Sequence, residues 1–128
     1  MILFCDEDIG TKVPDALKLV GLRTMSMSQR GWLSRPDVEW LTLAGQRGWL
    51  VFSCNKKMLK IPEERRAIIQ NKVGIVFLTN GEEHLPRVLW LLLVKWPWLE
   101  HIDKTQARPF VFFLTPYGRV RPQSLLSL

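Results

Sequence analysis

Residues 2–8 read ILFCDED, a short apolar run that ends abruptly at three acidic residues. A continuous apolar run of this length is typical of a strand that is buried on both faces of a sheet. Residues 49–55 read WLVFSCN and repeat the pattern, with polar side chains directly after an apolar run. Both runs are predicted to be buried strands, and the polar residues would lie at their carboxyl ends.

The rest of the chain alternates between strand-like and helix-like patterns. Further strands are predicted over residues 22–27 and 74–78. Helices are predicted over residues 11–20, from 36 to the glycines at 45 and 48, over 62–71, over 82–95 and, after a break at residues 96–98 (WPW), over a shorter stretch to 105. Residues 110–114 and 119–121 flank a turn near 116–118 and are predicted to form a hairpin.

Strands that alternate with helices favour a parallel sheet with helices on both faces. We therefore predict an α/β fold of three layers, α/β/α, with a mainly parallel four-stranded sheet in the order 2-1-3-4 and a C-terminal β-hairpin. No internal repeat or linker-like segment is found in the 128 residues, so a single domain over residues 1–128 is expected. The first and third strands would be neighbours, and ligands of such sheets bind where the strand order reverses.

Composition excludes several classes of protein. An apolar share of 47% and a charged share of 23% are ordinary for a globular domain and argue against disorder. Two cysteines without a CxxC pair and only two histidines make a disulfide scaffold or a structural zinc site unexpected, and a reducing cytoplasm is the simplest setting. No targeting signal is visible, and the longest apolar stretch, residues 88–94, is far too short to span a membrane.

Oxygen-bearing side chains are expected to meet at one edge of this sheet. Asp6 follows the first strand, Asn55 follows the third, and Asp37 begins the second helix on the same rim. One or two carboxylates with neutral oxygens are what Mg²⁺ requires. A bound cation would also relieve the repulsion among the three consecutive acids. The alternative is that each acid is structural, with Asp8 as the cap of the first helix and Asp37 as the cap of the second.

Basic residues surround the predicted acidic crevice. The net charge is +6, which favours an anionic partner such as nucleic acid. The candidates for contacts with phosphates are Arg30, Arg35, Lys56 and Lys57, and further cations follow at Lys60, Arg65 and Arg66. Trp32, in the loop beside Arg30, would either stack on a base or be buried against a neighbouring helix. The alternative for the cations is an ordinary solvated surface.

Three segments together resemble a PIN-like domain: LFCDEDI at residues 3–9, RPDVEWL at 35–41 and GQRGWLVFS at 45–53. The likeness covers most of the chain and is closest to small PIN-like proteins grouped with the VapC-type toxins of toxin–antitoxin pairs. It implies a metal-dependent endoribonuclease that uses Mg²⁺ or Mn²⁺.

The resemblance also implies roles for individual residues. The first acidic position falls on Asp6 with Glu7 beside it, and the second falls on Asp37, with Glu39 as an alternative. Asp6, Glu7 and Asp37 would hold the metal, while Asp6, Asp37 and Asn55 would form the catalytic set.

Asn55 departs from the family pattern, which has an aspartate there. A neutral amide keeps an oxygen donor but should weaken both metal binding and the activation of water. An inactive PIN-like domain that binds RNA or a protein partner is therefore the alternative function. The fourth acidic residue is not placed, although Glu82 and Glu83 follow the fourth strand. RNA and an antitoxin protein are the expected partners, with a homodimer as a further alternative and no membrane.

Overall fold

The computed structural model describes residues 1–80 and 84–125. Six strands are present in the described residues: β1 (Leu3–Cys5), β2 (Thr24–Ser26), β3 (Leu50–Ser53), β4 (Gly74–Leu78), β5 (Phe110–Leu114) and β6 (Val120–Gln123). Four α-helices are also described: α1 (Lys12–Leu19), α2 (Asp37–Arg47), α3 (Pro62–Gln70) and α4 (Leu85–Thr105). Two short 3-10 helices follow strands β1 and β3: η1 (Glu7–Ile9) and η2 (Lys56–Lys60).

The strands form one mixed sheet in the order β2-β1-β3-β4-β5-β6. The predicted order 2-1-3-4 is confirmed for the first four strands, and β5 and β6 form the predicted antiparallel hairpin. The predicted count of four parallel strands is wrong, because β5 also pairs in parallel with β4, from Gly74 opposite Phe110 to Leu78 opposite Leu114. The long helix α4 provides the crossover that brings β5 back in this direction.

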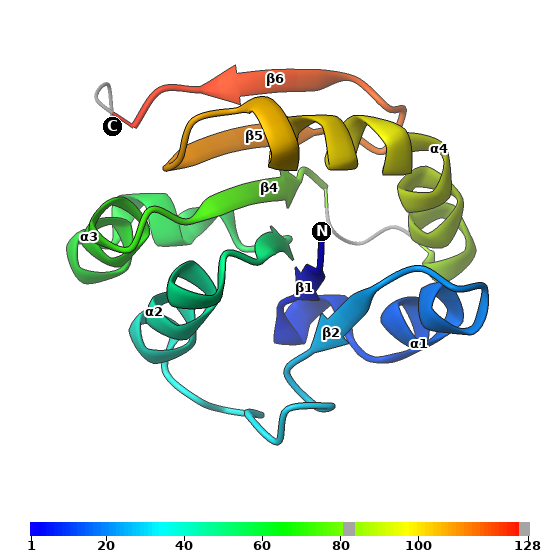
Figure 1. Cartoon of the computed structure of the whole chain (residues 1–128), viewed down its shortest axis with the longest axis horizontal. Helices are drawn as coiled ribbons and strands as arrows, with labels where there is room; N and C mark the ends of the chain where they lie inside the picture. Colours follow the sequence, from blue (N-terminus) through cyan, green and yellow to red (C-terminus); the bar gives the residue numbers. More distant parts are fainter. Residues whose placement is uncertain (81–83, 126–128) are drawn as a thin grey trace.

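Helices cover both faces of the sheet, as expected for strands that are apolar throughout (Figure 1). Alternate strand residues point to opposite faces. On one face Leu3 and Phe52 pack in the core formed with α1 and α4. On the other face Phe4 and Val51 pack in the core formed with α2 and α3. Hydrophobic burial on both sides therefore stabilises a three-layer arrangement and fixes which ends of the strands lie together.

Helix α4 corrects the prediction of a break at residues 96–98. The helix runs unbroken through Pro97. Trp96 and Leu99 are buried on its inner side, whereas Pro97 and Leu93 lie on the exposed side. The carbonyl of Leu93, which a proline four residues later leaves without its helical donor, can therefore be solvated by water. The predicted start of this helix at residue 82 lies outside the described residues.

Gly45 also departs from its predicted role as a helix-ending residue. It lies inside α2, which continues to Arg47, and Gly48 ends the helix with a left-handed φ of 68°. A Cβ on Gly45 would lie only 2.4 Å from the carbonyl oxygen of Asn71, just beyond α3. The glycine thus permits a close approach of α2 and α3.

Trp32 is buried, with 7% of its surface exposed, so the prediction of base stacking is wrong; the side chain is buried, but its aromatic neighbours lie in β1 and directly before β3 and not in a helix. Its ring lies 5.8 Å from that of Phe4 and 6.2 Å from that of Trp49. This aromatic cluster anchors the loop that precedes α2. None of the helices in the described residues is long and apolar enough to cross a membrane.

Candidate acidic active site

The site lies at the carboxyl ends of β1 and β3, which are adjacent and parallel. Cys5, the last residue of β1, is opposite Phe52 of β3, and the next residue, Asp6, donates its N–H to the Phe52 carbonyl at 2.9 Å. Asp6 and the residues after Ser53 therefore leave the sheet side by side. This is the convergence that the two strand patterns predicted.

Asp6 is held by hydrogen bonds from both strand ends. Its side chain is buried, with 5% of the residue exposed. Oδ1 accepts the N–H of Glu7 at 2.6 Å, and Oδ2 accepts the hydroxyl of Ser53 at 2.8 Å. The Ser53 oxygen accepts the N–H of Asn55 at 2.9 Å. This chain of hydrogen bonds fixes the Asp6 carboxyl relative to the backbone N–H of Asn55.

The two other acids of the opening motif diverge. Oδ2 of Asp8 accepts the N–H of Cys54 at 3.1 Å, and Oε1 of Glu7 accepts the N–H of Ser34 at 3.0 Å. Helix α1 receives no side-chain cap at its N-terminus, so Asp8 is not the cap that the structural alternative required. It instead ties η1 to the end of β3.

Asp37 lies in the first turn of α2 and does not cap that helix either. Its Oδ1 accepts the indole N–H of Trp40 at 2.9 Å. Because Trp40 is fully buried, this bond fixes the Asp37 carboxyl at the rim of the site. The alternative that Asp37 serves only as a helix cap is therefore wrong.

Glu64, which sequence analysis did not select, lies beside Asp37. It belongs to the first turn of α3, and its Oε2 is buried with no hydrogen-bond donor among the described residues. Burial and the adjacent Asp37 carboxyl raise the pKa of Glu64 to about 7. The sequence pattern predicts only a helix over residues 62–71 and gives Glu64 no role in the site. No sequence signal identifies Glu64, because its position beside Asp37 depends on the packing of α2 against α3, which Gly45 permits.

The clustered carboxyls shift one another's ionisation. Burial, together with the charge of Asp8, raises the pKa of Asp6 to about 7, against the lowering effect of the bonds from Ser53 and Glu7. Burial also raises the pKa of Asp8. Several carboxyls therefore share a region in which the charged forms are unfavourable, and a divalent cation would relieve this cost.

These acids line one open cleft of about 450 Å³. It contains every predicted catalytic and metal-binding residue together with both predicted lysines; its lining comprises Asp6, Glu7, Asp8, Asp37, Cys54, Asn55, Lys56 and Lys57. The hard oxygen donors of this lining fit Mg²⁺ or Mn²⁺. Within residues 1–80 and 84–125, however, no three His, Cys, Asp or Glu residues lie close enough to form a ready-made metal site.

Two predicted RNA-binding residues lie outside this lining. The guanidinium of Arg30 lies 4.8 Å from the ring centre of Trp32. Arg35 forms an ion pair with Glu39 at 2.9 Å. Glu39, the alternative to Asp37 as the second acidic residue, is therefore paired with an arginine and does not line the cleft. Both arginines therefore contact the aromatic loop and helix α2 rather than the acidic cleft. Their role in binding RNA stays a prediction.

The cysteines do not contribute a nucleophile. Burial and the neighbouring Asp8 and Asp6 raise the pKa of Cys54 to about 12, and burial raises the pKa of Cys5 further. Neither thiol is ionised at neutral pH, and the thiolate is the reactive form.

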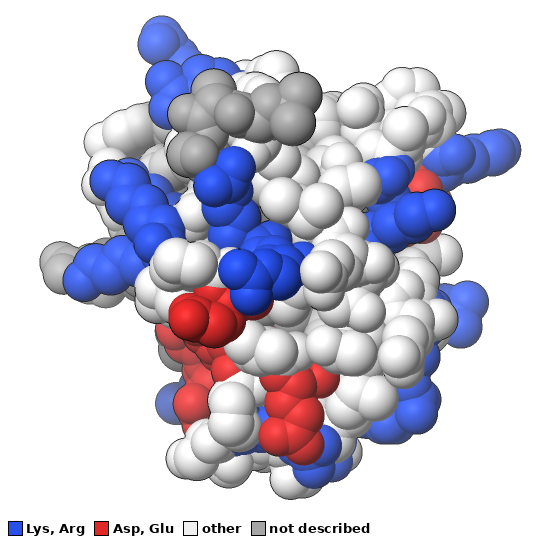
Figure 2. All heavy atoms as spheres, turned by 90° about the vertical axis from the view of Figure 1, so that its left-hand side faces the viewer, with Lys and Arg blue, Asp and Glu red and all other residues white. Residues whose placement is uncertain are grey.

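Charge is distributed unevenly around the cleft. Figure 2 shows the side of the molecule formed by α2 and α3, where Lys and Arg gather directly above a group of Asp and Glu side chains. On this face a group of cations thus lies next to the acids, and further Lys and Arg side chains lie beside and below them.

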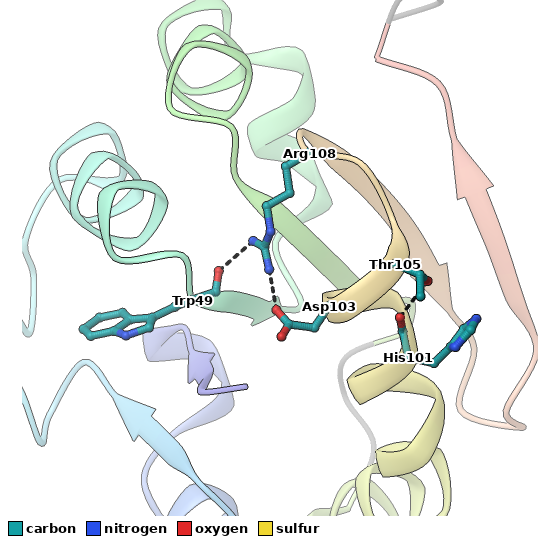
Figure 3. A network of polar contacts seen from close by, with 5 residues as sticks. All are labelled: Trp49, His101, Asp103, Thr105 and Arg108. Atoms are coloured by element: carbon teal, nitrogen blue, oxygen red, sulfur yellow. Dashed lines mark hydrogen bonds and ion pairs between the residues drawn. The ribbon is translucent and has the colours of Figure 1, made fainter.

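Another basic residue, Arg108, has a structural role near the amino end of β3, whereas the acids lie at its carboxyl end (Figure 3). Its guanidinium donates to the carbonyl of Trp49 at 3.0 Å and forms an ion pair with Asp103 of α4. It thus ties the end of α4 to the start of β3, far along the strands from the acids. At the end of α4, the hydroxyl of Thr105 donates to the carbonyl of His101 at 2.7 Å.

Comparison with known proteins identifies the architecture of this site. A family model described as a PIN-like domain matches residues 1–80, which extend from β1 through β4 and contain every acid of the cleft described above. No curated protein and no solved structure matches the chain. PIN-like domains are grouped with nucleases, and PIN domains generally use divalent metals. With more than half of its length matched and its acids gathered at the carboxyl edge of the sheet, the chain belongs to the PIN-like domain family.

Proposed function

We propose that this protein is a metal-dependent endoribonuclease that acts in the acidic cleft. The observation that carries the proposal is the position of Asp6, fixed between two parallel strand ends and facing the same cleft as Asp37. Lys56 and Lys57 line that cleft and supply positive charge for a phosphate. Carboxylates and cations side by side suit a site that binds a phosphodiester and a divalent metal together.

Asp6 and Asp37 would hold the metal, and Glu7 would assist from the same cleft. Asp8 adds a carboxylate in the cleft, and Glu64 adds one beside Asp37. When bound, Mg²⁺ or Mn²⁺ would polarise the phosphate and favour ionisation of a nearby water. The ammonium groups of Lys56 and Lys57 would bind the phosphate oxygens. The Asn55 amide would orient a water molecule or provide a neutral oxygen ligand.

Cleavage of RNA by the native chain tests this proposal. A fluorescent RNA of mixed sequence is incubated with Mg²⁺ or Mn²⁺, and kcat/KM is compared with that of Asp6→Asn. The asparagine preserves the size of the side chain and removes its charge, but it keeps only one of the two oxygens that accept from Glu7 and Ser53, so the melting temperature of the variant is measured beside its activity. We expect a loss of at least about 100-fold. Glu63→Gln, an exposed change on α3, is the matched control and should retain native activity. Equal cleavage by native protein and Asp6→Asn would exclude the catalytic proposal.

A specific observation favours a second candidate, a domain that binds RNA or a protein partner without cleaving it. Asn55 lies in the cleft where the family pattern has an aspartate, so one negative charge is missing. The change Asn55→Asp restores it beside Asp6. If the native chain binds RNA without cleaving it and Asn55→Asp creates cleavage, the second candidate is correct. Under the primary proposal the native chain is already active, and Asn55→Asp increases its kcat and its affinity for Mn²⁺.

The resemblance to VapC-type toxins leads us to place the protein as the toxin half of a pair. Its antitoxin would occupy the acidic cleft or the surface next to it. Expression of the chain alone should then arrest growth, and Asp6→Asn should abolish the arrest. Co-expression with the product of a small neighbouring reading frame should restore growth. Normal growth during expression of active native enzyme would exclude the toxin role but not the nuclease. Light scattering of the purified chain tests the homodimer.

A further inference from the structure

A second hollow lies on the other side of η2 from the acidic cleft. It has a volume of about 820 Å³, and its polar lining consists of Lys60, Arg65, Arg66 and Gln70. We call these four residues the basic groove. The five-residue helix η2 joins the two hollows, since Lys56 and Lys57 line the acidic cleft and Lys60 lines the groove. At about 2 Å per residue in a 3-10 helix, the two sets of cations are separated by less than about 10 Å along η2.

No cation of the basic groove forms an ion pair within the part of the chain that the structure describes. No acidic residue lines the groove, and the ion pairs of the described residues are Arg35–Glu39 and Arg108–Asp103. The neighbouring carboxyl of Glu64 lies against Asp37 instead. Cations that line one hollow without forming ion pairs repel one another, and an anion in the groove would reduce that repulsion.

Arg65 is held in place for such a role. Its guanidinium donates to the carbonyl of Leu125 at 2.5 Å, and its Nε is buried without a partner among the described residues. Lys60 and Arg66, which also line the groove, are exposed. The groove therefore combines one fixed guanidinium with two adaptable cations, and Ile69 supplies an apolar wall.

The acidic cleft needs such a neighbour if its ligand is a polyanion. Four carboxyls and only two lysines line the cleft, so the cleft is negative without a bound metal. This charge repels the phosphates that flank the scissile phosphate of the RNA. A strand is held there only if cations bind its phosphates outside the cleft. We propose that the basic groove binds the phosphate backbone of a single RNA strand next to its scissile phosphate. This inference rests on the proposed function and assigns the path of its substrate.

Binding without divalent metal tests the groove separately from cleavage. The native chain in EDTA is titrated into a fluorescent twelve-nucleotide oligouridine between 50 and 200 mM salt. The double variant Lys60→Gln/Arg66→Gln should lose about two phosphate contacts. The negative slope of log K against log salt should therefore become shallower by about 1.4. The ratio of native to variant affinity should therefore be about sevenfold larger at 50 mM salt than at 200 mM salt. Lys18→Gln/Lys104→Gln, with the same loss of charge at exposed positions on α1 and α4, is the matched control and should bind within twofold of native.

The outcomes separate the two proposals. Equal binding by the groove variant and the control variant would overturn the groove, even if the native chain cleaves RNA. Groove-dependent binding by a chain that cleaves no RNA with any metal would overturn the nuclease and support the groove. Binding of polyglutamate in place of oligouridine would show that the groove takes an acidic protein, and would overturn its assignment to RNA.

Discussion

Ser53 shows how a single buried hydroxyl organises the acidic cleft. It is fully buried at the end of β3, donates to Asp6 and accepts the N–H of Asn55. An apolar residue there would leave the Asp6 oxygen without a donor in a buried environment, which costs about 1–3 kcal/mol. The hydroxyl also favours the ionised form of Asp6 and so opposes part of the effect of burial. Ser53 therefore positions Asp6 and keeps its carboxylate accessible to a cation.

Glu64 leads to a prediction at the residue scale. Its carboxyl repels that of Asp37, so Glu64→Gln should raise the melting temperature in metal-free buffer at pH 8. If Glu64 also contributes to the metal site, the same change should weaken Mn²⁺ binding by about 10-fold or more, as loss of a supporting group does in other metal sites. Calorimetry measures both effects. Glu63→Gln, the exposed neighbour, should change neither. A Glu64→Gln protein with native Mn²⁺ affinity would restrict Glu64 to a structural role.

At the scale of elements, the contact of α2 with α3 determines which acids meet. Gly45 permits this contact, because a Cβ there would lie 2.4 Å from the Asn71 oxygen and 2.7 Å from its Cβ. The first turns of the same two helices carry Asp37 and Glu64. A residue far from the cleft thus helps to set the distance between two of its carboxyls.

The corresponding prediction concerns Gly45→Ala. The added methyl group must push apart two helices that meet through backbone atoms, so the free energy of unfolding should fall by about 2 kcal/mol. Urea denaturation measures this loss. Gln46→Ala, an exposed change on the same helix, should stay within about 0.5 kcal/mol of native. A Gly45→Ala protein as stable as native would show that the close approach is not required.

Sequence patterns predicted the elements that depend on local signals and missed those that depend on tertiary contacts. Apolar runs followed by polar residues located β1 and β3 and the convergence of Asp6 with Asn55, because parallel strands end at one edge. The continuous path of α4 through Pro97 depended on which side of the helix faces solvent. Glu64 was missed because its neighbour Asp37 lies on another helix, and sequence spacing does not show how two helices pack.

At the scale of the whole molecule, the acids of the cleft reduce stability near neutral pH. The pKa of Asp6 rises from 3.8 to about 7, so between about pH 4 and pH 7 the folded state keeps a proton that the unfolded state has released. The free energy of unfolding therefore falls as the pH rises through this range. For Asp6 alone the loss is at most about 4 kcal/mol. Asp8 and Glu64 act in the same direction, since their pKa values are also raised.

Asp6→Asn isolates this contribution, because asparagine is uncharged at every pH tested. Without divalent metal, native protein should lose stability from pH 5 to pH 8, and the variant should lose less. The two should be closest at pH 5, where Asp6 is protonated in the folded state, and the variant should be the more stable at pH 8. Urea denaturation in EDTA at pH 5, 6, 7 and 8 measures the difference. Glu100→Gln, an exposed change on α4, should follow the native curve. A difference between native and Asp6→Asn that is constant with pH would show that burial leaves the Asp6 carboxyl with its ordinary ionisation. Asp6 would then carry no unfavourable charge for a cation to relieve.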